Sequence, residues 1–485
     1  MQRDGRWHGK LGPVMKVQLR LVFIALGISG LGAALLYELL RRPGYFTNST
    51  YLGSIIAIEI VLACLWRFKT VFFPVTMGSF LLAGTVLPFA GESFTIRWLF
   101  LGVGAFAGSI IWIRSIRNKH FGVFHLVALF SVLAALASAS ASHTPMTALL
   151  KAGSLFLLFL YASTGGRVAL AGREGSFVHG LVLATEILVF VTAISDFVGY
   201  DLFGNPNNMG AFVGVIATPI LLWAAMVAEN RGERQRHYTA LALCVVLLYV
   251  TVCRAAIVAD AVVTIVLTMG LRRPRLLLKA AFIVALLLET MAVANPEHMS
   301  ELTDSLSERF VFKIEGNRPR QGVLSSRSTP WDETLSAVAH HPWLGTGFGT
   351  SDLGLGQSDL GQSSIYTTEG TNREHGSSYL ALVEYMGLLG IMPFLLLLFL
   401  LMRAVTRVYM WMRRTRSAYH YAVPFAMVTL AALIHAAFED WLFAAGSYLC
   451  LFFWVLGFLL IDLTSGNADL GVLHHSGNVR LQQVR

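Results

Sequence analysis

Long apolar runs separated by short polar connections fill most of the chain. Many of them approach the roughly 20 residues that an α-helix needs to cross the hydrocarbon core of a bilayer. The pattern predicts an all-α polytopic membrane protein with about 14 transmembrane helices, or about 12 to 14 if short runs fail to span. The predicted spans are 21–40, 51–66, 71–90, 98–113, 123–141, 146–165, 177–198, 209–228, 238–253, 255–271, 280–294, 377–402, 421–437 and 441–463.

One polar segment, residues 295–376, is much longer than the other connections. Loops of that length usually have a function of their own. We therefore predict a cytoplasmic amino terminus at 1–20, helices 1 to 11 within 21–294, a large periplasmic loop at 295–376, helices 12 to 14 within 377–463, and a cytoplasmic tail at 464–485.

The composition supports this division. The chain is 55% hydrophobic and 13% charged, which excludes an ordinary soluble globular protein. Its net charge of +9 does not indicate nucleic-acid binding, because the basic residues stand in short clusters between apolar runs. Most of the 37 Lys and Arg residues fall in the cytoplasmic connections, as the positive-inside rule requires. The four cysteines lie in or beside apolar runs without metal-type spacing, so neither a disulfide nor a zinc site is expected.

A few basic residues oppose the positive-inside bias and become candidates for anion binding. Arg97 and Arg254 lie in short outer connections, Lys151 lies inside a span, and Arg327 lies in the large loop. Arg41 and Arg42 are expected only to snorkel from a helix end.

The surroundings of Arg327 suggest how it would hold a phosphate. Thr329, Pro330 and the acid Asp332 predict a helix start with Thr329 as the N-cap and Pro330 at the first position. A guanidinium beside the free N–H groups of a helix amino terminus can bind phosphate. The alternative is an arginine solvated at the loop surface.

Two further polar motifs have weaker signals. Gly345, Gly347 and Gly349 alternate, which permits close backbone approach to a ligand. The sequence Asn-Pro-Asn-Asn at 205–208 places Asn207 where it could bind sugar hydroxyls, although a plain turn is slightly favoured.

The end of the large loop carries ionisable residues. His375 can act as a base near neutral pH, with Glu374 as its substitute or orienter. The alternative is an inert loop histidine. Glu384 lies about two turns inside the next predicted span, where a carboxylate is costly unless it faces a polar cavity.

Together these residues resemble the O-antigen ligase and polymerase superfamily. The resemblance covers roughly residues 200 to 400 and rests on the order of Cys253-Arg254-Ala255-Ala256, Arg327 with Trp331, His341-Pro342-Trp343-Leu344-Gly345-Thr346-Gly347, His375 with Tyr379-Leu380, Glu384, and Gly387-Leu388-Leu389-Gly390. The chain departs from the family pattern at Cys253, where serine is common, and at His375-Gly376, where His-Asn is usual.

The resemblance implies a metal-independent, cofactor-free glycosyltransferase in the bacterial inner membrane with its site facing the periplasm. Such enzymes move a glycan from undecaprenyl pyrophosphate to an acceptor, either another lipid-linked glycan or a lipid A core, in the synthesis of surface polysaccharide or lipopolysaccharide. Residues matching Arg254 and Arg327 hold the pyrophosphate, and one matching His375 assists the acceptor. Polymerase and ligase both remain open, as does a chain-length regulator as partner.

A transporter or flippase is the alternative function. Ionisable residues inside predicted spans can line a translocation path. Against transport, the sequence shows no internal repeat of the kind many carriers have. The residues concerned are Glu38, Glu59, Lys151, Glu186, Asp196, Asp260 and Glu289.

Overall fold

The computed structural model describes residues 29–30, 32–34, 37, 41, 49–87, 90–115, 121–275, 289, 325–351 and 375–465. Within these ranges the regular structure is helical and contains no strand. The chain divides into two compact units, Met1–Ala63 and Cys64–Arg485. The first unit holds most of α2 (Ser49–Trp66), and all the helices discussed below belong to the second.

Six helices in the described part of the chain are long and apolar enough to cross a membrane. This finding supports a multi-pass, all-α membrane protein, while the number of about 14 spans stays a prediction. Most of the predicted spans 21–40 and 280–294 falls outside the described residues, as does most of the large loop. The six helices are Ala90–Arg114, Pro145–Leu170, Glu174–Phe197, Pro206–Val227, Met392–Thr415 and Tyr448–Ser465; the shorter apolar helices are Ile55–Trp66, Phe68–Ala83, Val123–Ala139 and Ala422–His435.

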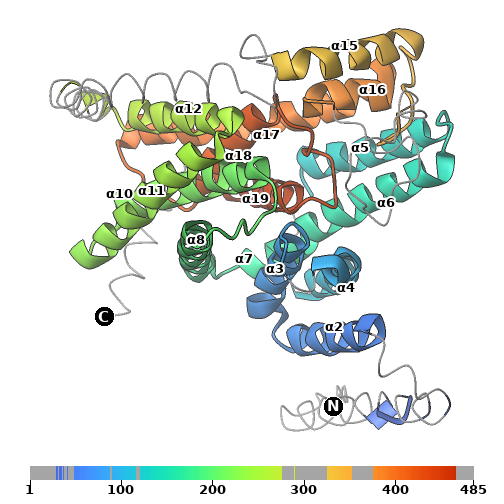
Figure 1. Cartoon of the computed structure of the whole chain (residues 1–485), viewed down its shortest axis with the longest axis horizontal. Coiled ribbons are helices and arrows are strands. Elements are labelled where there is room, and N and C mark those ends of the chain that lie inside the picture. Colours follow the sequence, from blue (N-terminus) through green and yellow to red (C-terminus); the bar gives the residue numbers. More distant parts are fainter. Residues whose placement is uncertain are drawn as a thin grey trace, which may run out of the picture. The chain divides into compact units, whose positions relative to one another are not determined.

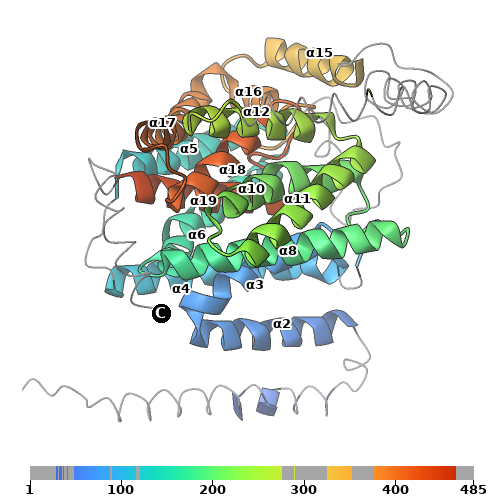
Figure 2. The same cartoon turned by 90° about the vertical axis from the view of Figure 1, so that its left-hand side faces the viewer.

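The second unit is built around two helices that are buried along most of their length, α18 (Ala422–His435) and α19 (Tyr448–Ser465). Helix α18 packs against α10 (Thr218–Val227), α12 (Arg254–Gly270), α17 (Met392–Thr415) and α19 (Figure 1; Figure 2). Helix α8 (Glu174–Phe197), in contrast, keeps large apolar side chains such as Ile187 and Ile194 exposed, as a lipid-facing helix does. Helix α11 (Arg231–Thr251) packs against α8 and α10.

A second group of helices lies beside this centre. Helix α4 (Ala90–Ser115) packs against α3 (Phe73–Ala83), which follows the π-helical segment η2 (Phe68–Phe72). It also packs against α6 (Pro145–Tyr161), which continues through the π-helical segment η3 (Ala162–Gly166) into α7 (Arg167–Leu170). Helix α5 (Val123–Ala139) packs against α6 and α17. A Cβ on Gly108 of α4 would lie 2.6 Å from the backbone nitrogen of Gly165, so only glycine allows this crossing.

Two predicted spans have different bounds in the structure. The run 377–402 forms two helices, α16 (Ser378–Gly390) and α17, because Gly387 has a φ of 59° that interrupts the helix. The run 441–463 becomes helical only at Tyr448, which leaves 436–447 as a partly buried connection between α18 and α19. Hydropathy cannot detect these breaks because both segments are apolar on either side of them.

The predicted helix start at Thr329 is also wrong. Helix α15 already includes Ser325 and extends to His340, with Pro330 inside it, so Thr329 is not an N-cap. Arg327 therefore belongs to the helix itself. Proline removes one backbone hydrogen bond, but here the turn before it is held by an ion pair between Arg327 and Glu439. The N-cap pattern at Thr329 considers only neighbouring residues in the sequence, so it cannot take account of this distant ion pair.

Candidate active site

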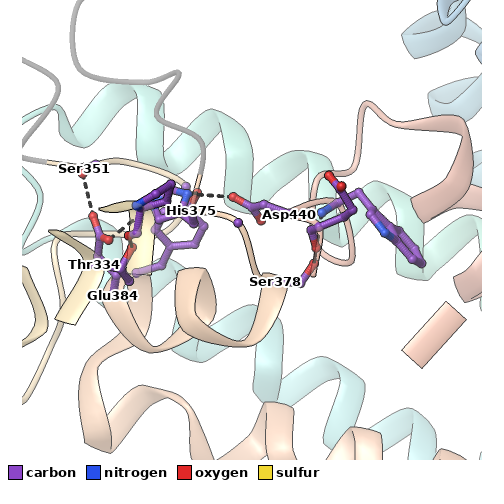
Figure 3. Close-up of polar contacts among 12 residues, drawn as sticks. Thr334, Ser351, His375, Ser378, Glu384 and Asp440 are labelled. Carbon is purple, nitrogen blue, oxygen red and sulfur yellow. Dashed lines mark hydrogen bonds and ion pairs between the residues drawn. The ribbon is translucent and has the colours of Figure 1, made fainter. Parts of the chain in front are cut away.

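His375 lies between two carboxylates at the start of α16. Its Nδ1 is 2.7 Å from Oδ2 of Asp440, and its Nε2 is 3.4 Å from Oε2 of Glu384. Figure 3 shows the resulting row of Ser351, Glu384, His375 and Asp440. The side chains of His375 and Glu384 are 2% and 0% exposed, whereas that of Asp440 is 20% exposed. Asp440 is therefore the accessible end of this row.

The two carboxylates determine the charge of the histidine. Burial by itself lowers the pKa of His375, but the hydrogen bonds and negative charges of Asp440 and Glu384 outweigh burial and raise this pKa to about 9. At neutral pH the ring is thus an imidazolium that donates from Nδ1 to Asp440 and forms an ion pair with Glu384 through Nε2. Ser351 supports the arrangement by donating a 2.6 Å hydrogen bond to the other oxygen of Glu384.

Asp440 and its neighbour Glu439 are held in place by Ser378, the first residue of α16. The Ser378 hydroxyl donates to the Glu439 carbonyl at 2.6 Å and accepts from the backbone N–H groups of Trp441 and Leu442, both at 3.0 Å. The Ser378 backbone N–H also donates toward the carbonyls of Ala436 and Glu439. One serine therefore joins α16 to the connection between α18 and α19.

Arg327 reaches the same connection from α15. Its guanidinium forms an ion pair with Glu439, and both side chains are mostly buried. Trp331, one turn further along α15, donates from its indole to the Gly376 carbonyl at 3.2 Å. Gly376 has a φ of +64°, and a Cβ there would lie 3.0 Å from Cδ of Arg327. Glycine beside His375 therefore lets the arginine pass close to the chain.

Arg254 is the first residue of α12, directly after a break in which Val252 has a φ of 51°. Burial and the positive charge of Arg327 both lower the pKa of Arg254. The two guanidinium groups, 73 positions apart in the sequence, are thus close enough to interact electrostatically. The fold therefore brings together the two arginines that the sequence suggested for an anion.

The glycine-rich run packs on protein. Gly345, Gly347 and Gly349 all have a positive φ. A Cβ on Gly345 would lie 2.4 Å from the Glu384 carbonyl oxygen, and one on Gly349 would lie 2.4 Å from Cδ of Lys151. The space that these Cβ atoms would fill is therefore occupied by protein, and close approach of these glycines to a ligand stays a prediction. They let the loop dock on α16, next to Glu384.

Lys151 and Arg97 also have structural partners. Lys151 donates from Nζ to the Gly349 carbonyl and lies within electrostatic range of Asp440. Arg97 donates to the Gly446 carbonyl at 2.6 Å, and its guanidinium lies 4.5 Å from the Phe94 ring centroid. Both side chains thus support segments that carry the row around His375.

The remaining candidates lie elsewhere. Asn205 caps α9 (Pro206–Ala211) by accepting from the Asn207 backbone N–H at 2.8 Å, so the motif begins a helix rather than forming a plain turn, and sugar binding by Asn207 stays a prediction. Glu374 falls outside the described residues. Glu186, proposed for a transport path, accepts from Arg236 and His237 of α11 at 3.1 and 2.6 Å and so has local partners.

The carboxylates beside His375 do not form a metal site. They lie on opposite ring nitrogens, so they cannot converge on one ion without displacing the histidine. In the described part of the chain, no group of three or more His, Cys, Asp and Glu residues has the arrangement to hold a metal ion.

Residues 239–395 match a protein-family model described as O-antigen ligase. The match includes Arg254, Arg327, His375 and Glu384. This segment is similar to the O-antigen ligase family. The resemblance inferred from the sequence is therefore confirmed. It supports an O-antigen ligase- or polymerase-like function of the glycosyltransferase type. No curated protein matches the chain in sequence.

The sequence reasoning missed several residues around the segment similar to the O-antigen ligase family. Glu439 and Asp440 lie beyond the matched segment, and Ser351 and Ser378 lie within it. One signal for the two acids was available, because Glu439-Asp440 is a charged pair in a three-residue gap between predicted spans. The serines had no such signal, since their role depends on contacts between distant segments.

Proposed function

We propose that the protein transfers a glycan from undecaprenyl pyrophosphate to a sugar hydroxyl at the periplasmic face of the bacterial inner membrane. One observation carries the proposal: Arg254 and Arg327 interact electrostatically, and Arg327 contacts the connection that holds His375. Paired guanidinium groups suit a pyrophosphate, which carries several negative charges and planar oxygen pairs. The family match independently supports lipid-linked glycan and acceptor as the substrates.

Transfer breaks the bond between the anomeric carbon and the pyrophosphate oxygen. The electron pair of that bond leaves with the pyrophosphate, so positive charge near this oxygen stabilises the transition state. Arg254 and Arg327 supply such charge and can do so without a metal ion. In the resting structure Glu439 is bound to Arg327, and the donor pyrophosphate would compete with this carboxylate for the guanidinium.

The acceptor hydroxyl forms the new bond to the anomeric carbon and loses its proton. We assign proton removal to the pair of His375 and Asp440, with Asp440 as the accessible member. At neutral pH the His375 ring is already protonated in most molecules. Only the fraction of molecules in which the ring is neutral can therefore accept the proton of the acceptor hydroxyl. Asp440 then stabilises the imidazolium that forms.

The acceptor itself distinguishes two related activities. A polymerase uses another lipid-linked glycan, and a ligase uses a lipid A core; both use the donor chemistry described above. Glycans that accumulate after deletion of the gene distinguish them. Single lipid-linked repeat units indicate a polymerase, and long lipid-linked chains indicate a ligase.

Arginine variants test the proposed function. We expect Arg254→Ala and Arg327→Ala each to lower transfer by about a hundredfold or more, because removal of a preorganised charge that stabilises a transition state has effects of that order. Arg254→Lys and Arg327→Lys should retain part of the activity, since lysine keeps the charge but lacks the planar fork. The measurement is product formation by purified protein with lipid-linked glycan and acceptor.

The matched control is Arg413→Ala, which removes an exposed arginine near the end of α17. Its transfer rate and membrane abundance should equal those of the wild type. Normal transfer by both Arg254→Ala and Arg327→Ala at normal abundance would contradict the pyrophosphate role. A chelator in the same assay should leave the rate unchanged.

A further inference from the structure

A cavity with a volume of about 250 Å³ lies between α5, α17 and α19. Its lining includes His125 from the first turn of α5, Arg403 and Arg407 from α17, and Ile461 and Asp462 from α19. Direct contacts join these helices here, since the rings of Phe124 and Phe458 lie 4.9 Å apart between centroids. The cavity is therefore a feature of the packed helices.

The cavity is at the opposite end of these helices from His375. The other end of α5 carries Ser138, whose hydroxyl donates to the Tyr385 carbonyl on α16 at 2.6 Å. Helix α17 begins directly after α16 and first lines the cavity at Leu400. If His375 faces the periplasm, the positive-inside rule places the cavity at the cytoplasmic surface.

The charged residues of the cavity are arranged for an anion. Arg403 and Arg407 are four residues apart on one helix, so their side chains lie on the same face, and both are exposed. The nearby carboxylate of Asp462 forms an ion pair with Arg167. Arg167, which does not line the cavity, thus compensates the negative charge of Asp462. The two α17 arginines therefore make the lining positively charged.

His125 provides a second, independent observation. Its side chain is 7% exposed and lines the cavity, yet neither ring nitrogen has a hydrogen-bond partner among the described residues. Its neighbours are aromatic rings, with centroids of Phe121 and Phe458 at 5.3 and 5.4 Å. A buried imidazole without a hydrogen bond is costly, and a polar ligand in the cavity would satisfy it.

The surroundings of the cavity favour a lipid over a soluble ligand. Val123, which lines the cavity, is 66% exposed, and Phe121 and Phe399, next to lining residues in the sequence, are 63% and 62% exposed. Large apolar side chains at this density suit contact with acyl chains. A basic pocket between helices at the cytoplasmic surface is a typical headgroup site in membrane proteins.

We propose that this cavity binds the phosphate of an anionic phospholipid headgroup from the cytoplasmic leaflet. Arg403 and Arg407 bind the phosphate oxygens, His125 donates a hydrogen bond from one ring nitrogen, and the acyl chains lie along the apolar surface beside Phe121 and Phe399. The site is separate from the proposed transfer chemistry, and only its assignment to the cytoplasmic leaflet rests on the proposed function, through the orientation of His375.

Native mass spectrometry of the full-length protein tests this site. Phosphatidylglycerol, phosphatidylethanolamine and phosphatidylcholine are titrated separately into the detergent-solubilised protein. We expect phosphatidylglycerol to bind most tightly to the wild type. Arg403→Gln/Arg407→Gln should weaken this binding by about tenfold or more, because each arginine near a membrane surface contributes to attraction of anionic lipid. His125→Phe, which keeps an aromatic ring, should weaken it severalfold.

The matched control is Arg413→Gln/Arg414→Gln, which removes two exposed arginines from the same helix outside the cavity. Its lipid affinity should equal that of the wild type. Equal phosphatidylglycerol binding by the wild type and Arg403→Gln/Arg407→Gln would overturn the proposal, as would an equal loss in both double variants. If Arg403→Gln/Arg407→Gln does not fold, unchanged binding by His125→Phe overturns it.

Inorganic phosphate distinguishes the source of the ligand. Millimolar phosphate should not displace the bound phosphatidylglycerol, since it lacks the acyl chains that contact the apolar surface. Complete displacement would assign the cavity to a soluble phosphate compound and overturn the lipid assignment.

Discussion

His375 is buried between two carboxylates, and this position changes the chemistry expected of it. A solvated histidine is mostly neutral at physiological pH, whereas the negative charges of Asp440 and Glu384 keep this ring protonated up to about pH 9. A histidine with a raised pKa is a stronger base once neutral but is neutral in fewer molecules. The pH dependence of transfer therefore reports the state of His375.

If His375 and Asp440 accept the acceptor proton, kcat/KM should rise with pH, with a midpoint near pH 9, and level off at higher pH. The rate rises with pH because His375 must lose its proton before it can act as a base, and its raised pKa places this loss at high pH. Glu384→Gln removes one negative charge beside the ring and should shift the midpoint to lower pH. Steady-state rates between about pH 6 and 10 measure both effects. A rate that falls as pH approaches 9 would instead indicate that the imidazolium acts as an acid.

At the scale of elements, the site depends on breaks in apolar segments. Helix α16 is interrupted at Gly387, and the freed N–H groups of Leu388 and Leu389 donate to the Pro342 and Trp343 carbonyls at 2.8 and 3.2 Å. A Cβ on Gly387 would lie 2.4 Å from the Trp343 backbone. The break thus anchors the glycine-rich loop that leads to Ser351.

Ser378 connects α16 to the segment that carries Asp440, on the other side of His375. We expect Ser378→Ala to lower transfer strongly while the protein still folds, because the N–H groups of Trp441 and Leu442 lose their acceptor and Asp440 moves. Leaving buried donors without partners costs about 1–3 kcal/mol each at most. Transfer rate and melting temperature are the two measurements.

Ser154→Ala on α6 is the control for that variant, since its hydroxyl bonds only the carbonyl one turn earlier in the helix. It should leave both quantities nearly unchanged. Wild-type transfer by Ser378→Ala would show that the connection around Asp440 keeps its position without the serine.

For the whole molecule, the predicted orientation can be tested by thiol labelling. The four native cysteines are all buried and free, so they provide a low background. We expect Asp332→Cys, on an exposed position of α15, to react with a membrane-impermeant maleimide added from the periplasmic side. Arg414→Cys, exposed near the end of α17, should react only after the membrane is permeabilised. The reverse pattern would contradict the orientation drawn from the positive-inside rule.

Much of the fold could be predicted because hydropathy is a local property. The predicted spans 123–141 and 177–198 nearly coincide with α5 and α8. The prediction was wrong for 377–402, where a positive φ at Gly387 separates two helices without any change in polarity. It was wrong at Thr329 because a distant ion pair holds the preceding turn of α15.

By itself the sequence determined the membrane class, the family resemblance, and the choice of Arg254, Arg327 and His375 as candidates. Apolar runs, uncompensated charges and motif order can all be read without coordinates. Only the tertiary structure decided that His375 is held by Asp440, 65 positions away, and by Glu384. The charge state of a buried group depends on its neighbours in space, and those neighbours come from separate helices that meet only when the chain packs.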